Sequence, residues 1–239
     1  MSTSLPGAPL LAAANLTKSY GNSTALAGVS LQVRPGEATA VMGASGSGKT
    51  TLLHCLAGII LPDTGSVRLF GTATGVPAEI TSLDDAARSA LRRTEFGFVF
   101  QQGLLIPELT AGENVALALM LNGTPRQVAE QQAAAALAAL GLAGMEGRRI
   151  GELSGGQAQR VAIARAQVNG ARVLFADEPT GALDSRTSAD VMALLLQSVA
   201  GTGRALVVVT HDPEVARWCS RVLTLADGRI VADTAGVAR

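Results

Sequence analysis

Short apolar runs separated by turn residues alternate with stretches of helical pattern along this chain. Between Leu10 and about Val41 the apolar runs are divided by turn sequences such as Tyr20-Gly21-Asn22 and Arg34-Pro35-Gly36-Glu37, which predicts short strands or hairpins. Gly228 marks a last hairpin turn. Strands that alternate with helices indicate an α/β fold with a mostly parallel sheet. The remaining strands are expected at 38–42, 67–70, 96–100, 173–176, 205–210 and 221–226, and the helices at 50–57, 82–93, 186–199 and 213–218.

A different composition marks the middle of the chain. From about Thr110 to Leu142 the residues are mainly Ala, Leu, Gln and Glu, which favour helices, and few of them are β-branched. We therefore expect a helical subdomain at 103–165, inserted into a core formed by 10–102 and 166–239. All 239 residues are expected to form a single domain.

The composition is apolar, yet the apolar runs are too short to predict a membrane span. Mean hydropathy is +0.31, but the longest runs, 115–121 and 206–209, fall far short of the roughly 18 residues that a spanning helix needs. No Lys or Arg precedes Lys18, so a secretory signal is not expected. Cys55 and Cys219 show neither a disulfide framework nor metal-ligand spacing and are expected to be packing residues. These features predict a cytoplasmic protein.

The charges of the chain balance, with 19 basic and 19 acidic residues and a formal net charge of zero. Such a balance provides no general electrostatic attraction to nucleic acid or to an anionic membrane surface. Nucleic acid is therefore not expected among the partners.

Residues 43–50 are the strongest chemical signal in the sequence. They match the phosphate-binding pattern G-x-x-x-x-G-K-[ST] without a mismatch, between an expected strand and an expected helix. The backbone N–H groups of such a loop and of the helix start surround phosphate oxygens. Lys49 can reach the β- and γ-phosphates, and the Thr50 hydroxyl can ligate Mg²⁺. The candidate phosphate-binding residues are Gly43, Ala44, Ser45, Gly46, Ser47, Gly48, Lys49, Thr50 and Thr51.

Two acidic residues follow the apolar run at 173–176. A parallel strand buried on both faces is apolar throughout, and ligands of an open α/β sheet bind at the carboxyl ends of its strands. Asp177 is therefore expected to hold Mg²⁺ through water, and Glu178 to act as the general base for the attacking water. An acidic pair by itself could equally cap a helix, so this interpretation depends on the phosphate loop.

A second phosphate-binding helix start is predicted at Leu153-Ser154-Gly155-Gly156-Gln157. Ser154 suits the N-cap of a helix that runs through Arg165. Glycines in a first turn weaken a helix but leave its N–H groups uncovered, as anion binding requires. A capped helix without a ligand is the alternative.

Together these motifs resemble those of the ATP-binding cassette (ABC) ATPases over nearly the whole chain. The resemblance implies a P-loop NTPase (RecA-like) core with an N-terminal antiparallel β subdomain and an inserted α-helical subdomain. It makes 43–50 the Walker A loop, Asp177 and Glu178 the Walker B pair, and 153–157 the signature motif. The residues of the signature motif that it implies in ATP binding are Ser154, Gly155, Gly156 and Gln157.

The resemblance also assigns single residues outside these motifs. Gln101 matches the glutamine that contacts Mg²⁺ and the attacking water, and His211 matches the histidine that contacts the γ-phosphate. Asp184 belongs to a loop that lies across the dimer seam. Tyr20 stands where the family stacks an aromatic ring on adenine, and the alternative is that it fills a gap in the core.

Cofactors and partners follow from the same resemblance. In this family two chains associate head to tail, so that the Walker A loop of one and the signature motif of the other enclose each ATP. The resemblance implies ATP and Mg²⁺ as cofactors and a homodimer with two working sites, because both motifs and Glu178 are intact. A heterodimer stays open.

Within the family the sequence is most similar to the branch that contains MacB, LolD and FtsE. This similarity, at 96–101, 107–110 with 113–115, and 177–185, implies a separate membrane permease as partner and a peripheral position on the inner face of the cell membrane. Where the branch tends to have Ser-aromatic-Asn-Leu-Leu-Pro, this chain has Gln102-Gly103-Leu104-Leu105-Ile106-Pro107. The stretch borders the groove that receives a permease helix, so the run 104–106 is expected either to contact the partner or to belong to the core.

The motifs favour an ATPase that drives an export or mechanotransmission permease, and three other functions are alternatives. A regulatory ATPase that controls cell-wall hydrolysis through a membrane partner is compatible with the same motifs. ABC ATPases of DNA repair carry long coiled coils or zinc modules and basic surfaces, which this sequence lacks. A P-loop kinase would have no use for a signature helix.

Overall fold

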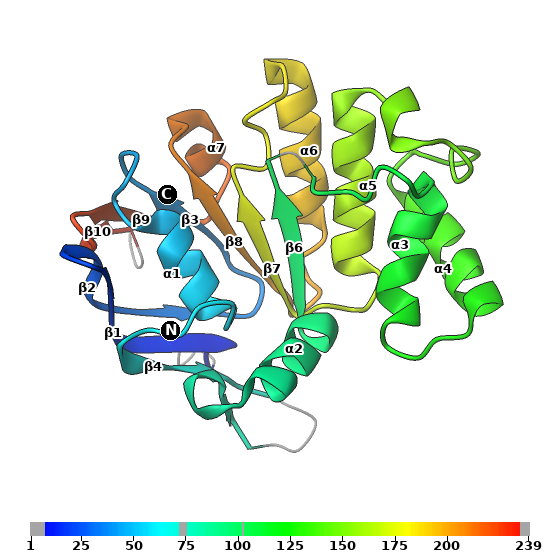
Figure 1. Cartoon of the computed structure of the whole chain (residues 1–239). Coiled ribbons are helices and arrows are strands. Elements are labelled where there is room, and N and C mark those ends of the chain that lie inside the picture. The colour runs from blue at the N-terminus through cyan, green and yellow to red at the C-terminus, as the bar shows by residue number, and fades with distance from the viewer. Residues whose placement is uncertain (1–7, 72–75, 102, 235–239) are drawn as a thin grey trace, which may run out of the picture. The chain divides into compact units, whose positions relative to one another are not determined.

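The computed structural model describes residues 8–71, 76–101 and 103–234. These residues form two compact units, which are described in turn (Figure 1). The first unit comprises the described residues up to Ser89 and those from Val199 onward, and the second is Ala90–Ser198. The boundaries expected for a helical subdomain, 103–165, differ from this division and stay a prediction.

The first unit contains an antiparallel sheet that begins with a long hairpin. The hairpin consists of β1 (Leu11–Tyr20) and β2 (Ser23–Val33), and Tyr20 pairs with Ser23 across a two-residue turn. The sheet order is β2-β1-β4-β5, with β4 at Thr64–Leu69 and β5 at Ala78–Glu79. The hairpin predicted with its turn at Tyr20-Gly21-Asn22 is confirmed, and its strands are long because register shifts on both sides of Leu16 let the pairing continue.

Parallel strands form the other layer of the first unit. β3 (Ala38–Met42) pairs in parallel with both β8 (Ala205–Thr210) and β9 (Arg221–Ala226). All six residues of β8 are buried, as expected for a parallel strand covered on both faces. The predicted last hairpin is confirmed, since Asp227 and Gly228 connect β9 to β10 (Arg229–Asp233), both with positive φ.

Within its described residues, the first unit contains two whole α-helices, α1 (Lys49–Leu56) and α7 (Pro213–Arg217). The helix expected at 82–93 is instead a 3₁₀ turn, η1 (Ile80–Ser82), followed by α2 (Asp85–Thr94). It begins late because the Asp84 carboxylate accepts a hydrogen bond from the Ala87 N–H at 2.7 Å, which caps α2.

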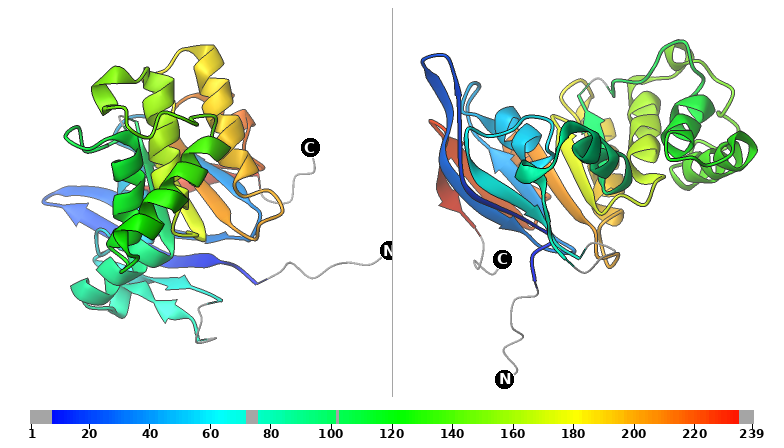
Figure 2. Two further views of the ribbon diagram at one scale, coloured as in Figure 1. Left: turned by 90° about the vertical axis from the view of Figure 1, so that its right-hand side faces the viewer. Right: turned by 60° about the horizontal axis from the view of Figure 1, so that its bottom comes forward.

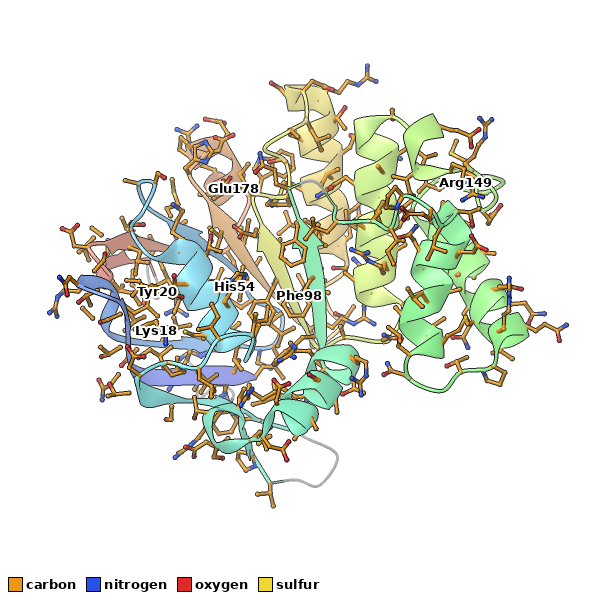
Figure 3. All side chains as sticks on the ribbon, viewed as in Figure 1. Lys18, Tyr20, His54, Phe98, Arg149 and Glu178 are labelled. Carbon is orange, nitrogen blue, oxygen red and sulfur yellow. The ribbon has the colours of Figure 1, made fainter. Side chains whose placement is uncertain are left out.

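The second unit is built on one parallel pair of strands, β6 (Phe96–Phe100) and β7 (Val173–Asp177). Phe98 stacks on Phe100 and on Phe175, with ring centroids 6.0 and 5.6 Å apart (Figure 3). These aromatic contacts fix the pair, and their carboxyl ends finish in register, with Phe100 opposite Asp177.

Four helices lie wholly within the described residues of the second unit. They are α3 (Ala111–Met120), α4 (Arg126–Ala139), α5 (Gly155–Gln167) and α6 (Ser185–Gln197), and η2 (Ile150–Glu152) precedes α5. Helix α5 contacts β6, α3, α4 and α6, so it is the central helix of the unit (Figures 1 and 2).

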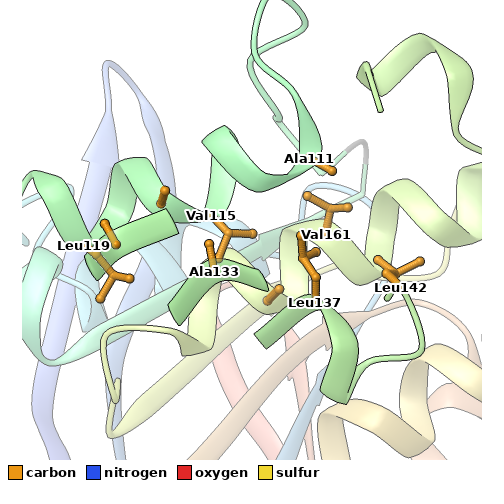
Figure 4. Close-up of a cluster of buried hydrophobic side chains, with 10 residues drawn as sticks. Ala111, Val115, Leu119, Ala133, Leu137, Leu142 and Val161 are labelled. Carbon is orange, nitrogen blue, oxygen red and sulfur yellow. The ribbon is translucent and has the colours of Figure 1, made fainter. Parts of the chain in front are cut away.

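The stretch expected to be helical at 110–142 contains two helices. A capping box between Thr110 and Glu113 starts α3, and its hydrogen bonds hold the pKa of the Glu113 carboxyl below its usual range. Gly123 with φ +86° and then Pro125 separate α3 from α4. The helices share a buried cluster in which small alanines allow close packing: Ala111, Val115, Ala116, Leu119, Ala129, Ala133, Leu137, Leu142, Val161 and Ala164 (Figure 4).

The cysteines and the apolar segments behave as the composition predicts within the described residues. Cys55 and Cys219 are both buried and unbridged, which confirms them as packing residues, and burial raises the pKa of the Cys55 thiol to about 11. Within 8–71, 76–101 and 103–234, no helix is both long enough and apolar enough to cross a membrane.

Candidate active site

The phosphate-binding pattern lies in the first unit, in the loop that joins β3 to α1. Gly48 is the N-cap of α1 with φ +100°, and no side chain caps this helix start. A Cβ at Gly48 would lie 2.1 Å from the Ala25 carbonyl oxygen, and a Cβ at Gly43 would lie 2.2 Å from that of Leu225. The loop therefore needs glycine at these positions for reasons of space, and its helix start keeps N–H groups that no side chain occupies.

Lys49 and Ser47 show how polar groups are held in this loop. The Lys49 ammonium donates to the carbonyl oxygens of Gly43 and Ala44 at 2.8 and 2.9 Å, so the side chain folds back over the loop. The buried Ser47 hydroxyl has no hydrogen-bond partner among the described residues. An unpaired buried hydroxyl beside an ammonium with a third donor suits a phosphate oxygen.

Thr50 and Thr51 continue the motif into the first turn of α1, and the Thr50 side chain is exposed. His211 follows β8 directly and is exposed, one residue before Asp212, which caps α7 by accepting from the Glu214 N–H at 2.8 Å. The structure thus places both at the carboxyl ends of neighbouring parallel strands, β3 and β8.

Tyr20 closes β1 and is 50% exposed, which excludes the alternative that it fills a gap in the core (Figure 3). The Lys18 ammonium lies 5.7 Å from the centre of the ring and 2.8 Å from an Asp63 carboxylate oxygen. The bond between Lys18 and Asp63 raises the pKa of the Lys18 ammonium and lowers that of the Asp63 carboxyl. The Lys18 ammonium thus lies over one face of a ring that is otherwise half exposed, and the stacking role of Tyr20 stays a prediction.

In the second unit the paired strands place two of the predicted catalytic residues, Gln101 and Glu178, after neighbouring strand ends. Gln101 follows β6 and Glu178 follows β7, each one residue beyond the last register pair, Phe100 and Asp177. Glu178 has φ +48°, a left-handed conformation that a non-glycine residue adopts only under constraint. The backbones of Gln101 and Glu178 thus leave neighbouring strands at the same edge of the pair.

Gly181 brings Gln101 still closer to the Glu178 turn. The Gly181 N–H donates to the Glu178 carbonyl oxygen at 3.1 Å, and a Cβ at Gly181 would lie 2.9 Å from the Gln101 amide nitrogen. The side chain of Gln101 therefore lies directly over this turn, and a Cβ at position 181 would displace its amide.

The signature helix start has the capping box that Ser154 predicts. The Ser154 hydroxyl accepts from the Gln157 N–H at 3.3 Å, and the Gln157 side chain accepts from the Ser154 N–H at 2.9 Å. Gly155 and Gly156 occupy the first helical turn, whose N–H groups have no intrahelical acceptor. The N-cap predicted at Ser154 is thus confirmed, and the phosphate-binding role of this helix start stays a prediction.

Packing between helices is a second reason for glycine at positions 155 and 156. A Cβ at Gly156 would lie 2.4 Å from the Thr187 methyl carbon, and one at Gly155 would lie 3.3 Å from a Leu183 methyl carbon. Close packing of α5 against the start of α6 therefore favours glycine at 156, and a Cβ at 155 would make a tight contact. The sequence contains no local sign of this contact.

Asp184 caps α6, and this use was not expected. Its carboxylate accepts from the N–H groups of Arg186 and Thr187 and from the Thr187 hydroxyl, and these bonds lower its pKa. Its role at a dimer seam stays a prediction.

The predicted Mg²⁺ ligands are oxygen donors of three kinds. They are the Thr50 hydroxyl, the Gln101 amide and the Asp177 carboxylate. Within the described ranges, His, Cys, Asp and Glu residues do not gather in a group of three or more that could hold a metal ion. A set of few oxygen donors fits Mg²⁺, which is commonly held by one or two protein groups together with phosphate and water.

Sequence reasoning missed one buried polar residue beside this site, Gln159, which is 3% exposed. It lies on α5, among residues whose apolar neighbours are buried. A glutamine in an otherwise buried helix face is a recognisable signal, because an amide without hydrogen bonds is costly to bury.

Comparison with known proteins gives one family. The family model described as "ABC transporter" matches residues 26–181, which is more than half of the chain. Among curated proteins, the chain is 44% identical over 233 residues to a pyoverdine export ATP-binding/permease protein, PvdT, of Pseudomonas entomophila, covering 95% of this chain and 35% of that protein. It is 46% identical over 231 residues to a macrolide export ATP-binding/permease protein, MacB 1/2, of Paracoccus denitrificans, covering 95% and 34%. The chain thus spans about a third of the length of these relatives.

Solved structures give the same result for the fold. A dimeric structure of MJ0796, described as a bacterial ABC transporter cassette, matches with a TM-score of 0.83 and 38% identity, covering 93% of this chain and 97% of that one. A dimeric post-hydrolysis state of the MJ0796 cassette, bound to ADP and Pi, matches with a TM-score of 0.82 and the same identity and coverage. The expected P-loop NTPase fold is confirmed by these neighbours.

Proposed function

The chain belongs to the ABC transporter family, and from this we propose that it binds and hydrolyses ATP and drives a membrane permease of the export or mechanotransmission type. The observation that carries the proposal is the β3–α1 loop, with its uncapped helix start, the folded-back Lys49 and the unpaired Ser47 hydroxyl. Phosphate release by the purified chain with ATP and Mg²⁺ is the direct test. Absence of turnover in the wild-type chain, together with absence of ATP binding, would contradict it.

Each candidate residue has a definite role in this proposal. The loop 43–48 and Lys49 bind the phosphates, and the Tyr20 ring stacks on adenine. Thr50, Gln101 and Asp177 hold Mg²⁺, which supplies charge neutralisation at the phosphates. Glu178 accepts a proton from the attacking water. His211 contacts the γ-phosphate.

The dimer follows the head-to-tail arrangement implied by the resemblance. Two chains enclose two ATP molecules. The signature motif of each chain contacts the nucleotide bound to its partner through Ser154, Gly155, Gly156 and Gln157. The uncovered N–H groups of the first α5 turn and the dimeric cassette neighbours support this arrangement. Asp184 lies at the seam.

Replacing Ser154 with Arg tests the role of the signature motif. We expect ATP binding to be retained and turnover to fall by on the order of 100-fold, because a long side chain obstructs the groups that stabilise charge on the transferred phosphate. Nucleotide binding by fluorescence, ATP-dependent dimerisation by light scattering and phosphate release are the measurements. The matched control is Ser154→Thr, which retains a capping hydroxyl, and equal turnover in the Arg and Thr variants would refute the role.

The permease partner is proposed to dock on the second unit, at a groove of about 230 Å³ beside β6. Phe96, Phe98 and the exposed Leu121 supply its apolar surface, and Arg92 and Arg93 stand among its lining residues. An apolar helix with acidic residues at one end fits such a surface. The names of the curated relatives, export ATP-binding/permease proteins, support export.

The residues of the atypical run 104–106 differ in burial, so neither partner contact nor core packing describes all three. Leu104 and Ile106 are 59% and 38% exposed, so the core interpretation is wrong for them, whereas Leu105 packs against the buried helical cluster. Arg165 donates to the carbonyl oxygens of Gly103 and Leu104 at 2.7 and 2.8 Å, and burial lowers the pKa of its guanidinium. Gln102 lies outside the described residues. We propose that Leu104 and Ile106 contact the permease.

Charge reversal at the groove tests the docking site. We expect the Arg92→Glu/Arg93→Glu variant to bind the permease at least about tenfold more weakly, since it places negative charges against the acidic residues of the permease helix. Co-purification from detergent-solubilised membranes measures the complex, and basal ATPase is measured in parallel. The control, Arg126→Glu/Arg148→Glu, makes the same charge change at exposed arginines outside the groove. Equal loss of the permease in both variants would rule out this groove.

A further inference from the structure

Gln159 is the polar side chain that ties α5 to the two loops of the candidate catalytic residues. It is 3% exposed and lies one turn after the capped start of α5. Its side-chain nitrogen donates to the carbonyl oxygen of Phe100 at 3.0 Å and to that of Pro179 at 2.7 Å. Phe100 immediately precedes Gln101, and Pro179 immediately follows Glu178.

The two bonds use a property that few side chains share. An amide NH₂ group offers two donors from one neutral nitrogen, and here each donor meets a carbonyl oxygen at the end of a different strand, β6 or β7. An ammonium would bring an unpaired charge into a buried position, and an apolar side chain would leave both carbonyl groups without this partner. The residue type is thus fitted to joining these two chain segments.

Further contacts of α5 reach the other end of the Gln101 segment. A Cβ at Gly103 would lie 3.6 Å from the Gln159 side-chain oxygen, so this oxygen faces Gly103. Arg165, six residues further along α5, donates to the Gly103 and Leu104 carbonyl oxygens. Gln101 therefore lies between two points that are both fixed to α5.

The Glu178 turn has a particular need for such support. Glu178 is left-handed, with φ +48°, and such a conformation persists only where its surroundings determine it. The bond from Gln159 to Pro179 holds the residue after it, and the amide of Gln101 lies against Gly181 of the same turn. Fixing Phe100 and Pro179 with one side chain sets the spacing between the Gln101 and Glu178 backbones.

We propose that Gln159 is a positioning residue for hydrolysis, which holds Gln101 and Glu178 at a fixed spacing and connects both to the helix that begins with the signature motif. The proposal depends on the proposed function, because it assigns hydrolysis to Gln101 and Glu178. It predicts that Gln159 acts on turnover and not on nucleotide binding, because its contacts are with the loops of the reacting groups and not with the β3–α1 loop.

The first test replaces Gln159 with Met, which keeps the length and removes both donors. We expect kcat to fall by roughly 10- to 100-fold, as for loss of general acid–base geometry, while KM for ATP changes less than about threefold. Hydrogen–deuterium exchange in 101 and 103–104 and in 178–181 should become faster without nucleotide. A kcat within twofold of wild type, or an equal rise in KM, overturns the proposal.

The matched control is Gln167→Met on the same helix. The Gln167 side-chain nitrogen is buried without a hydrogen-bond partner in the described chain, so its loss removes an amide and no bond. We expect this control to keep wild-type kcat and exchange rates. Equal effects in the Gln159 and Gln167 variants would mean a general packing defect in α5 and would overturn the proposal.

A second variant, Gln159→Glu, keeps the side-chain shape and makes the effect depend on pH. Ionised, the carboxylate repels the Phe100 and Pro179 carbonyl oxygens, and protonated, it can donate to one of them. The ratio of variant to wild-type kcat should therefore rise severalfold as pH falls from about 8 to 6, because burial raises a carboxyl pKa toward this range. A flat ratio overturns the proposal. An inactive wild-type chain would contradict the proposed function, while the exchange comparison would still decide whether Gln159 holds the loops.

Discussion

Turnover should stop in the Glu178→Gln variant while ATP binding persists. Removal of a general base lowers kcat by about 10²–10⁴-fold, and the amide keeps the shape of the carboxylate at the end of β7. The left-handed backbone at Glu178 is set by its surroundings, so the substitution adds no new steric demand. Because hydrolysis no longer separates the chains, we expect ATP to stabilise a dimer in this variant.

Two measurements check this result together. Single-turnover phosphate release gives the chemical rate, and size-exclusion chromatography with and without ATP and Mg²⁺ gives the dimer. The control is Glu130→Gln, the same change at an exposed position of α4 where Glu130 forms only a surface ion pair with Arg126 at 2.6 Å. Hydrolysis within tenfold of wild type in Glu178→Gln would exclude Glu178 as the base.

Loss of ATP binding is expected when Gly48 is replaced by Ala. A left-handed alanine costs roughly 1–2 kcal/mol, and the new Cβ would lie 2.1 Å from the Ala25 carbonyl oxygen, so the backbone has to move. Movement at the N-cap of α1 displaces the N–H groups expected to bind phosphate. Charge-assisted hydrogen bonds are worth about 1.5–3 kcal/mol each, and loss of two of them weakens ATP binding by roughly 100-fold or more.

Gly36→Ala separates this steric effect from backbone strain. Gly36 has φ +76°, but nothing lies within 4 Å of the position that its Cβ would occupy, and the residue precedes β3, whereas the phosphate loop follows that strand. We expect a loss of stability of about 1–2 kcal/mol with ATP affinity unchanged. Isothermal titration with ATP and thermal unfolding of both variants are the measurements. Equal ATP affinity in the two variants would contradict the role of Gly48.

Local sequence determined the phosphate loop of the first unit and the start of the signature helix in the second unit. The G-x-x-x-x-G-K-[ST] pattern predicts a loop between a strand and a helix, and the structure places residues 43–48 between β3 and α1. Ser154 predicted the start of α5 to the residue, because an N-cap and its partner three residues on interact within one turn. Such features follow from the sequence because their physical cause lies within a few neighbouring residues.

Several strand and helix limits needed the neighbouring elements. The sequence predicts short strands or hairpins between Leu10 and Val41, and only pairing with β2 and β4 shows that shifts in register extend β1 past Leu16. Leu104, Leu105 and Ile106 form one apolar run, yet two of them are exposed and one packs on the helical cluster. An apolar run indicates that some of its side chains are buried, but it does not show which ones.

The sequence by itself determined the family motifs, the α/β class and the chemical types of the candidate residues. Only the tertiary structure decided why Gly43 and Gly156 have no alternative, since the obstructing atoms belong to Leu225 and Thr187, far away in the sequence. It also decided that Gln159 joins the Gln101 and Glu178 loops, because two strand ends distant in sequence meet at one side chain. The physical reason is that steric exclusion and hydrogen bonding act over a few ångströms in space, whatever the separation along the chain.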